Sequence, residues 1–282
     1  MAFELGYNTN GFSDHRLLDA IDVLAELGYG SVAITLDYHA LNPFDDDLWQ
    51  QARLVHERLQ ARNMCCVIET GARFLLDPWH KHWPTLVTAN HENRQRRVDF
   101  LKRAIEIAAY LNAEAVSFWS GAKDDDLTDD DAFDLLTEEC DSLLAWAVRH
   151  DVWLAFEPEP GMFVATMDQF AQLTAELNHP RFGLTLDVGH VHCLSDGTPA
   201  DRIKTFAKQL LNVHIEDMRV GVHEHLPFGD GDLDVAAVLQ ALNDVNYMGT
   251  VNVELARHSH DAVNLARRSL DYLKSLDLIT SN

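Results

Sequence analysis

Four segments in the second half of the chain each place an acidic or imidazole side chain after a short apolar run, at residues 154–157, 183–187, 211–214 and 250–254. Such runs are typical of buried strands. Because the carboxyl ends of parallel strands lie at one edge of a sheet, we expect the four side chains to face one another there. This set, called the quartet below, consists of Glu157, Asp187, His214 and Glu254.

Three carboxylates and one imidazole are a typical ligand set for a divalent metal ion. The oxygen-rich mixture suits Mn²⁺, Mg²⁺ or Co²⁺, and it takes Zn²⁺ less selectively. A single carboxylate at a strand end is common, but several on adjacent strands would be costly to bury without a cation. The sequence therefore predicts that the quartet is a metal site.

A divalent ion at this position would chelate a substrate carbonyl and its neighbouring hydroxyl and stabilise an enediolate. One glutamate would remove the proton next to the carbonyl, and a group on the opposite face would return one. Glu157 and Glu254 are the expected catalytic pair, because their strands lie on opposite sides of the ion. Return of the proton to the same carbon is epimerisation, return to the neighbouring carbon is isomerisation, and loss of a β-hydroxyl is dehydration. The sequence does not separate these reactions.

Three histidines accompany the predicted metal site. His190 follows Asp187 by three residues, and His223 and His225 lie after the third of the four segments. One interpretation is that His190 and His225 hydrogen-bond the substrate. Another is that all three histidines bind a second metal ion. A supporting role, or an exposed position in a loop, is the alternative for each.

Further residues at strand ends are candidates for substrate binding. Glu69, Trp119 and Glu159 lie at or just after the ends of the expected third, fourth and fifth strands, and Arg73 follows shortly after Glu69. The indole of Trp119 can pack on a sugar ring or cap the barrel core. Glu159 can orient a hydroxyl or lie exposed in a loop.

The predicted substrate is not phosphorylated. Barrel enzymes usually bind phosphate with the loops after the last two strands. Residues 229–232 in one of these loops read Gly-Asp-Gly-Asp, and the two carboxylates would repel a phosphate. The basic side chains after the last strand would instead attract a phosphate; they are Arg257, His258 and His260. We therefore expect an unphosphorylated sugar, keto-sugar or polyol.

Alternating short apolar runs and longer amphipathic stretches must position these residues, and this alternation predicts a parallel sheet with helical crossovers. Strands are expected at residues 3–8, 31–36, 64–69, 115–119, 152–157, 183–187, 211–215 and 250–255. Helices are expected at residues 14–27, 47–62, 92–111, 130–149, 167–177, 201–208, 234–243 and 261–273. Eight repeats of about 35 residues favour a (β/α)8 TIM barrel, and residues 1–282 fit one such domain.

Composition limits the partners and the location. The chain has 22 Lys and Arg against 45 Asp and Glu, a formal net charge of −23. Nucleic acids and anionic membranes bind clustered basic residues, so neither partner is expected. The sequence shows no membrane-spanning apolar stretch and no secretory signal. Four cysteines without a C-x-x-C pair are expected as reduced core thiols, which indicates a cytoplasmic location.

The order and spacing of five motifs resemble the xylose isomerase-like TIM barrel superfamily, which includes sugar isomerases, ketose and inosose epimerases, inosose dehydratases and endonuclease IV. The motifs are F-E-P at 156–158, L-D-V-G-H at 186–190, V-H-I-E-D at 213–217, H-x-x-x-G-x-G-D-x-D at 225–234 and V-E at 253–254. The resemblance implies that the quartet binds a divalent ion and that His190 and His225 lie near a small carbohydrate substrate. Members of the superfamily are often dimers or tetramers, so a homo-oligomer is compatible with it, although nothing in the sequence marks an interface.

The chain departs from two branches of this superfamily. Endonuclease IV holds three zinc ions with extra histidines after strands 3 and 4, where this chain has Glu69 and Trp119. Ketose 3-epimerases carry a second glutamate where this chain has Phe163, and an arginine for which Arg219 is an approximate match. Three alternatives to an isomerase or epimerase therefore stay open. They are a lyase or dehydratase acting on a keto-sugar or keto-inositol, an endonuclease IV-like phosphodiesterase, and a non-catalytic metabolite-binding barrel.

Overall fold

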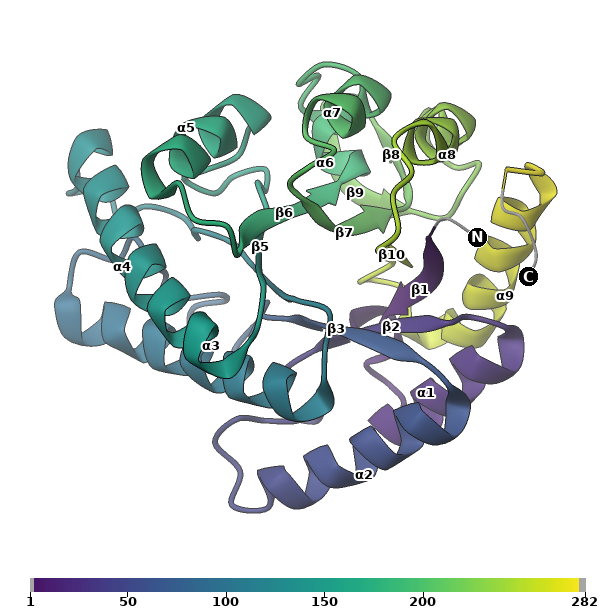
Figure 1. Cartoon of the computed structure of the whole chain (residues 1–282), viewed down its shortest axis with the longest axis horizontal. Helices are drawn as coiled ribbons and strands as arrows, with labels where there is room; N and C mark the ends of the chain where they lie inside the picture. The colour runs from purple at the N-terminus through teal and green to yellow at the C-terminus, as the bar shows by residue number, and fades with distance from the viewer. Residues whose placement is uncertain (1–2, 279–282) are drawn as a thin grey trace.

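The computed structural model describes residues 3–278, and parallel strands form a closed barrel at its centre (Figure 1). The barrel strands are β1 (Glu4–Asn8), β2 (Ser31–Thr35), β3 (Cys65–Glu69), β4 (Val116–Phe118), β5 (Leu154–Phe156), β6 (Phe182–Asp187), β7 (Leu210–Ile215) and β10 (Thr250–Val253). They pair in chain order, and β10 closes the barrel by pairing with β1. The (β/α)8 TIM barrel predicted from the sequence is confirmed.

Helices cover the outside of this barrel, between consecutive strands (Figure 1). They are α1 (Leu17–Leu27), α2 (Leu48–Arg62), α3 (His91–Leu111), α4 (Asp129–His150), α5 (Met167–Leu177), α7 (Pro199–Thr205), α8 (Val235–Asp244) and α9 (Ala262–Ser275). All lie within a few residues of the expected helices, because each has the apolar stripe that packs on the barrel.

Sequence patterns miss the short elements near the carboxyl ends of the strands. These elements are η1 (Thr9–Phe12), α6 (Val188–Cys193), β8 (Asp217–Arg219), β9 (Val222–Leu226) and η2 (Ser259–Asp261). The helix α6 has six residues, which is fewer than two turns, so it shows no helical periodicity. The strands β8 and β9 form an antiparallel hairpin outside the barrel sheet.

Polar side chains fill part of the barrel interior. Successive strand residues point to opposite faces, and parallel pairing puts inward residues of neighbouring strands in one layer. Asn212, Thr185 and Asn252 are fully buried. The Asn252 Nδ2 donates to Asn212 Oδ1 at 2.9 Å, and the Asn212 Nδ2 donates to Thr185 Oγ1 at 3.5 Å. A hydrogen-bonded polar layer therefore lies beneath the strand ends.

An aromatic cluster packs between the barrel wall and α5. Phe170 on α5 is fully buried, with its ring centroid 6.1 Å from that of Phe182 and 6.3 Å from that of Phe156. Phe156 also meets Phe118 edge to face at 5.3 Å. Large aromatic side chains contribute much of the apolar area that folding buries. This cluster fixes β5, the strand that Glu157 directly follows.

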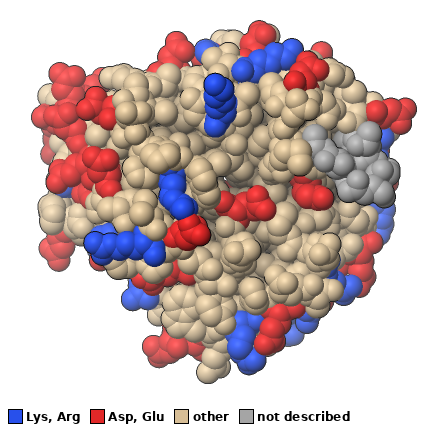
Figure 2. Space-filling model, viewed as in Figure 1, with Lys and Arg blue, Asp and Glu red and all other residues tan. Residues whose placement is uncertain are grey.

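The surface agrees with the acidic composition. The face drawn in Figure 2 has acidic side chains around much of its rim, with basic ones among them. In the part of the chain that the structure describes, no helix has the length and apolar character that crossing a membrane requires.

We predict that Phe170→Ala lowers the free energy of unfolding by about 3–5 kcal/mol, because it leaves a cavity against Phe182 and Phe156. Chemical denaturation followed by circular dichroism would measure the change. Met248→Ala is the control, since Met248 is 72% exposed, and it should change the free energy by less than about 0.5 kcal/mol. Equal effects of the two substitutions would contradict the packing described for α5.

Candidate functional site

A cavity of about 360 Å³ opens at the carboxyl ends of the barrel strands. Three members of the quartet line it, together with all three accompanying histidines and the predicted substrate-binding residues Glu69, Trp119 and Glu159. Barrel enzymes place their active sites at this end. The strand-end side chains singled out from the sequence therefore share one cavity.

The quartet converges as the sequence predicts. One potential ligand atom from each of its four side chains lies within 4.8 Å of the others. Asp187 ends β6 and His214 is its register partner on β7, while Glu157 and Glu254 directly follow β5 and β10. The Oδ2 atom of Asp187 is buried and has no hydrogen-bond partner among the described residues. An unpaired buried carboxylate oxygen in such a cluster fits a ligand to a cation.

His214 stands between three glutamates. Its Nδ1 atom lies 3.1 Å from Glu157 Oε1 and 2.9 Å from Glu254 Oε2, and its Nε2 atom lies 2.9 Å from Glu69 Oε1. Burial would lower the pKa of His214, but the three carboxylates raise it well above its usual value. The contact with Glu69 fixes one ring nitrogen, as a carboxylate often does for a metal-binding histidine.

The carboxyl groups of the cavity differ in pKa, because burial and neighbouring charges act on each of them to a different extent. Burial is the main cause that raises the pKa of Glu157 well above its usual range. Burial, with the charge of Glu254, raises the pKa of Glu159 to about 7. For Glu254 burial acts in the same direction, but the pairing with His214 outweighs it and lowers the pKa. The cavity therefore holds acidic groups with very different proton affinities.

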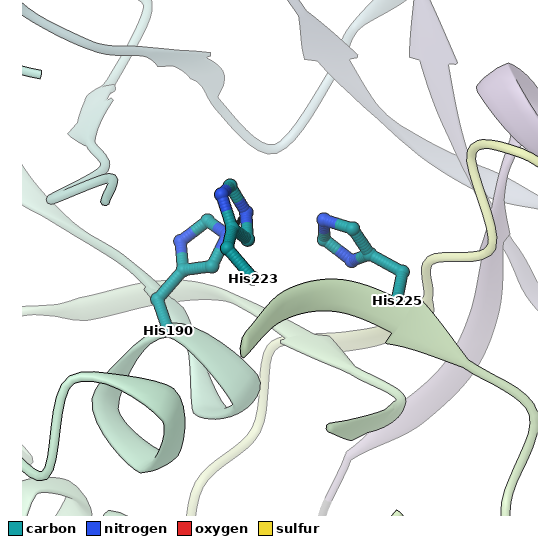
Figure 3. A group of neighbouring side chains, drawn as sticks. All are labelled: His190, His223 and His225. Carbon is teal, nitrogen blue, oxygen red and sulfur yellow. Dashed lines mark hydrogen bonds between the residues drawn. The ribbon is translucent and has the colours of Figure 1, made fainter. Parts of the chain in front are cut away.

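His190, His223 and His225 form a second cluster (Figure 3). It lies beside the quartet, since His190 Nε2 is 3.4 Å from Asp187 Oδ2. His190 comes from α6, and the other two come from β9. The Nε2 atoms of His190 and His223 are 3.1 Å apart, so one of them must carry the hydrogen. Burial lowers the pKa of His190 to about 4 and also lowers that of His223. Burial opposes the charging of His225, but the nearby carboxylates of Glu216 and Glu254 raise its pKa to about 10.

Glu216 is a site residue that sequence reasoning misses. Its side chain is fully buried, and neither carboxylate oxygen has a hydrogen-bond partner in the described part of the chain. One oxygen lies 3.8 Å from His225 Nδ1. A Cβ atom at Gly189 would come within 2.1 Å of the other oxygen, so Gly189 makes room for this carboxylate. Asp187, Glu216 and His225 form a third group of potential metal ligands.

Asp217 holds the segment that carries His223 and His225. Its carboxylate accepts backbone N–H bonds from Met218 at 2.9 Å, Gly229 at 2.8 Å and Leu233 at 3.0 Å. The sequence signal is an acidic residue between a buried strand and a glycine-containing loop. This pattern does not reveal which amides the acid bonds.

The loop between β3 and α3, residues 70–90, brings further side chains to the cavity, namely Arg73, Lys81 and His82. The buried Arg97 of α3 holds this loop by donating to the carbonyls of Pro84 at 2.7 Å and His82 at 2.7 Å. Its guanidinium also lies over the ring of Trp119, 5.1 Å from the centroid. The signal for this arrangement is an arginine on the apolar face of the expected helix.

Two residues differ from the expected arrangement. Arg219, the predicted substrate contact, does not line the cavity; its Nη2 atom donates to the carbonyl of Asp230 at 2.5 Å, on the exposed hairpin. Asn10, which the sequence does not single out, lies in η1 and donates from Nδ2 to Glu254 Oε1 at 2.6 Å. Asn10 lies on a short 3₁₀ helix, which has no sequence pattern by which the residue could be identified.

Comparison with protein families gives a match over most of the chain. A family model described as "Xylose isomerase-like TIM barrel" matches residues 21–276. The uncharacterized protein MJ1311 of Methanocaldococcus jannaschii is 24% identical over 245 residues, covering 81% of this chain and 80% of the relative. L-ribulose-5-phosphate 3-epimerase UlaE of Escherichia coli is 20% identical over 261 residues, covering 92% and 89%. A mannonate dehydratase of Oceanobacillus iheyensis is 26% identical over 129 residues, covering 41% and 37%.

Solved structures share the fold at low sequence identity. A D-tagatose 3-epimerase-like protein superposes with a TM-score of 0.78 at 18% identity, covering 97% of this chain and 99% of that one. The IOLI protein, solved with a bound zinc atom, superposes with a TM-score of 0.77 at 17% identity, covering 99% and 100%. These likenesses confirm the barrel fold.

We predict that Asp217→Ala lowers the free energy of unfolding by about 2–4 kcal/mol, because buried N–H groups lose their charged acceptor. Hydrogen exchange measured by mass spectrometry should also speed up across residues 217–233. Asp230→Ala, an exposed acid in the same loop, serves as the control and should leave both quantities unchanged. Unaltered exchange in Asp217→Ala would contradict the anchoring role.

Proposed function

The chain belongs to the xylose isomerase-like TIM barrel family, and from this premise we propose that it is a divalent-metal-dependent sugar isomerase or epimerase. The observation that carries the proposal is the convergence of the quartet in one cavity at the carboxyl end of the barrel. Several of these side chains are buried, and burial of this many acidic groups around one imidazole favours a bound cation.

The residues present fit such an ion. The quartet supplies carboxylate oxygens and one imidazole nitrogen, a set that suits Mn²⁺, Mg²⁺ or Co²⁺ and also accepts Zn²⁺. Asp187 Oδ2 has no hydrogen-bond partner among the described residues, its nearest charged neighbour being His190 Nε2 at 3.4 Å, and Glu69 holds the far nitrogen of His214. When bound there, a divalent ion supplies Lewis acidity toward a substrate carbonyl and its neighbouring hydroxyl.

Glu157 and Glu254 are the proposed catalytic pair. Both carboxylates line the cavity, and they reach His214 Nδ1 from strands on different sides of the barrel. One removes the proton from the carbon next to the carbonyl, which gives an enediolate, and the other returns a proton from the opposite side. Asn10 orients Glu254 through its 2.6 Å hydrogen bond. His190, His225, Trp119 and Glu159 are proposed to contact the sugar hydroxyls and ring.

The proposed substrate is an unphosphorylated sugar, keto-sugar or polyol. Asp230 and Asp232 lie in the loop after β9, and Arg219 is bonded to the Asp230 carbonyl instead of lining the cavity. The relatives support sugar chemistry, since one is named an L-ribulose-5-phosphate 3-epimerase and a structural neighbour is described as D-tagatose 3-epimerase-like. A second candidate is a lyase, favoured by the partial match to a mannonate dehydratase.

We also propose that His190, His223 and His225 can hold a second metal ion beside the quartet. Each of the three offers a ring nitrogen within 4.8 Å of the others. The lowered pKa values of His190 and His223 favour the neutral rings that bind metal, whereas His225, whose pKa is raised to about 10, would release a proton when the ion binds.

Deuterium exchange tests the proposed reaction. The metal-loaded protein is incubated in D₂O with a panel of ketoses and keto-inositols and followed by NMR, and we expect deuterium to appear next to a carbonyl. Glu157→Gln and Glu254→Gln should each slow this exchange by at least about 100-fold, because each removes a proton-transfer group.

Folding must be excluded as the cause of a loss in these variants. Thermal melts should show that both fold, and Glu57→Gln, an exposed acid on α2, should exchange at the wild-type rate. Exchange that persists in both site variants would contradict the catalytic pair, and no exchange with any substrate would contradict the reaction class.

Metal stoichiometry tests the two ion sites separately. We expect chelator-treated protein to take up two Mn²⁺ ions per chain by calorimetry and elemental analysis. His223→Ala should lose one ion and keep the other, whereas Asp187→Asn should weaken the quartet ion by about 10- to 100-fold or more. A single ion in both the wild type and His223→Ala would contradict the histidine site.

A further inference from the structure

Arg73 has a place in the cavity that the quartet and the barrel do not explain. It lines the cavity wall, and its side chain is 31% exposed. Its Nε atom lies 3.3 Å from Oδ2 of the buried Asp37, just after β2. In the described part of the chain, no hydrogen bond involves Nη1 or Nη2 of Arg73. The contact is an ion pair and not a hydrogen bond, since Asp37 Oδ2 has no hydrogen-bond partner among the described residues. It holds one edge of the guanidinium, and the two terminal nitrogens are left for another acceptor.

The backbone that carries Arg73 is strained and firmly held. Ala72 and Arg73 have φ angles of 53° and 24°, in the left-handed region that side chains other than glycine seldom occupy. The Arg73 carbonyl accepts from the His82 N–H at 2.6 Å, and Arg97 bonds the His82 carbonyl in turn. Such strain persists where the surrounding structure over-determines the conformation, and it often marks a ligand site.

An ion pair with a buried carboxylate distinguishes Arg73 from the other cations of the cavity. Lys81 and Arg257 also line it. Lys81 is exposed, and the side chain of Arg257 is 69% exposed and lies 3.9 Å from Glu224. Arg73 alone among these three is anchored by a buried carboxylate. An anchored guanidinium loses little freedom when it binds, which makes its fork of N–H donors an efficient binding site for an oxyanion.

We propose that Arg73 is the binding residue for an oxyanion group at the end of the substrate away from the reacting carbons. Two parallel N–H donors match the oxygens of a carboxylate or a phosphate monoester. This inference rests on the proposed function and deepens it, because it assigns the substrate to the anionic sugars. A carboxylate is the expected group, since one planar fork satisfies it, whereas barrels usually bind phosphate with helix N-termini.

Three ligands of one carbon skeleton test the subsite: D-glucitol, D-gluconate and D-glucitol 6-phosphate. Their affinities for the Mn²⁺-loaded protein are measured by calorimetry. We expect the wild type to bind one of the two anions about 10- to 100-fold more tightly than glucitol, the factor of one charged hydrogen-bond pair. Preference for gluconate assigns a sugar acid. Preference for the phosphate supports the subsite and overturns the unphosphorylated substrate.

Variants distinguish an anion preference caused by Arg73 from one caused by the other positive charges of the cavity. Arg73→Gln should abolish the preference, and Arg73→Lys should retain part of it. Arg257→Gln makes the same charge change at the same cavity and should reduce the preference less than threefold. Asp37→Asn keeps the charge of Arg73 but removes its anchor, so a loss of preference in this variant supports positioning. Thermal melts identify any variant that fails to fold.

Two results would overturn the subsite. The first is equal affinity of the wild type for glucitol and both anions, which includes no detectable binding of any. The second is a preference that survives in Arg73→Gln, as expected if the anion binds only the metal ion. None of the three ligands has an aldehyde or ketone carbonyl, so their binding is measured without turnover. A missing deuterium exchange with an intact anion preference would overturn the proposed reaction and leave the subsite standing.

Discussion

Charge balance around His214 is the interaction on which the rest of the site depends. Closing the barrel forces the inward side chains of neighbouring strands together, and here it brings Glu69, Glu157 and Glu254 within 3.1 Å of one imidazole. Removing an ion from water costs on the order of several kcal/mol unless a partner of opposite charge compensates. The three glutamates raise the pKa of His214 well above its usual value, which favours a positive charge on its ring. For the same reason, the carboxylates of the quartet would stabilise a bound divalent cation.

The carboxylates around His214 must be held in fixed positions, and the polar layer beneath the strand ends holds them. Asn212 connects the layer to the site, because its Nδ2 donates to Glu69 Oε1 at 3.0 Å and its Oδ1 accepts from Asn252. Gly6 lets Asn252 approach, since a Cβ there would lie 1.9 Å from Asn252 Oδ1. Barrel interiors are usually filled with branched apolar side chains. Here hydrogen-bond geometry, in place of packing alone, sets where the carboxylates lie.

The sequence was sufficient for the parts of the molecule that repeat. Strand periodicity located the eight barrel strands, and the residue that ends or follows each strand located the quartet, because parallel pairing brings strand ends to one rim. No periodic signal identifies the hairpin of β8 and β9, although Gly221 lies at its turn. Contacts such as those of Asp217, Arg97 and Asn10 join segments by a few bonds each. Such bonds follow from the folded geometry and leave no periodic signal.

An acidic protein can bind an anionic substrate, because its surface charges are screened by salt and water. Charges on the surface are screened over a Debye length of about 8 Å at physiological ionic strength, so most of the −23 acts weakly inside the cavity. Groups that line the cavity interact through less water and dominate the local field. Glu157 and Glu254 make one part of that lining acidic, where a cation would neutralise them, whereas Arg73 adds a fixed positive charge from the β3–α3 loop. A bound sugar with one oxyanion could then span both parts, its carbonyl near the cation and its charged end at the guanidinium.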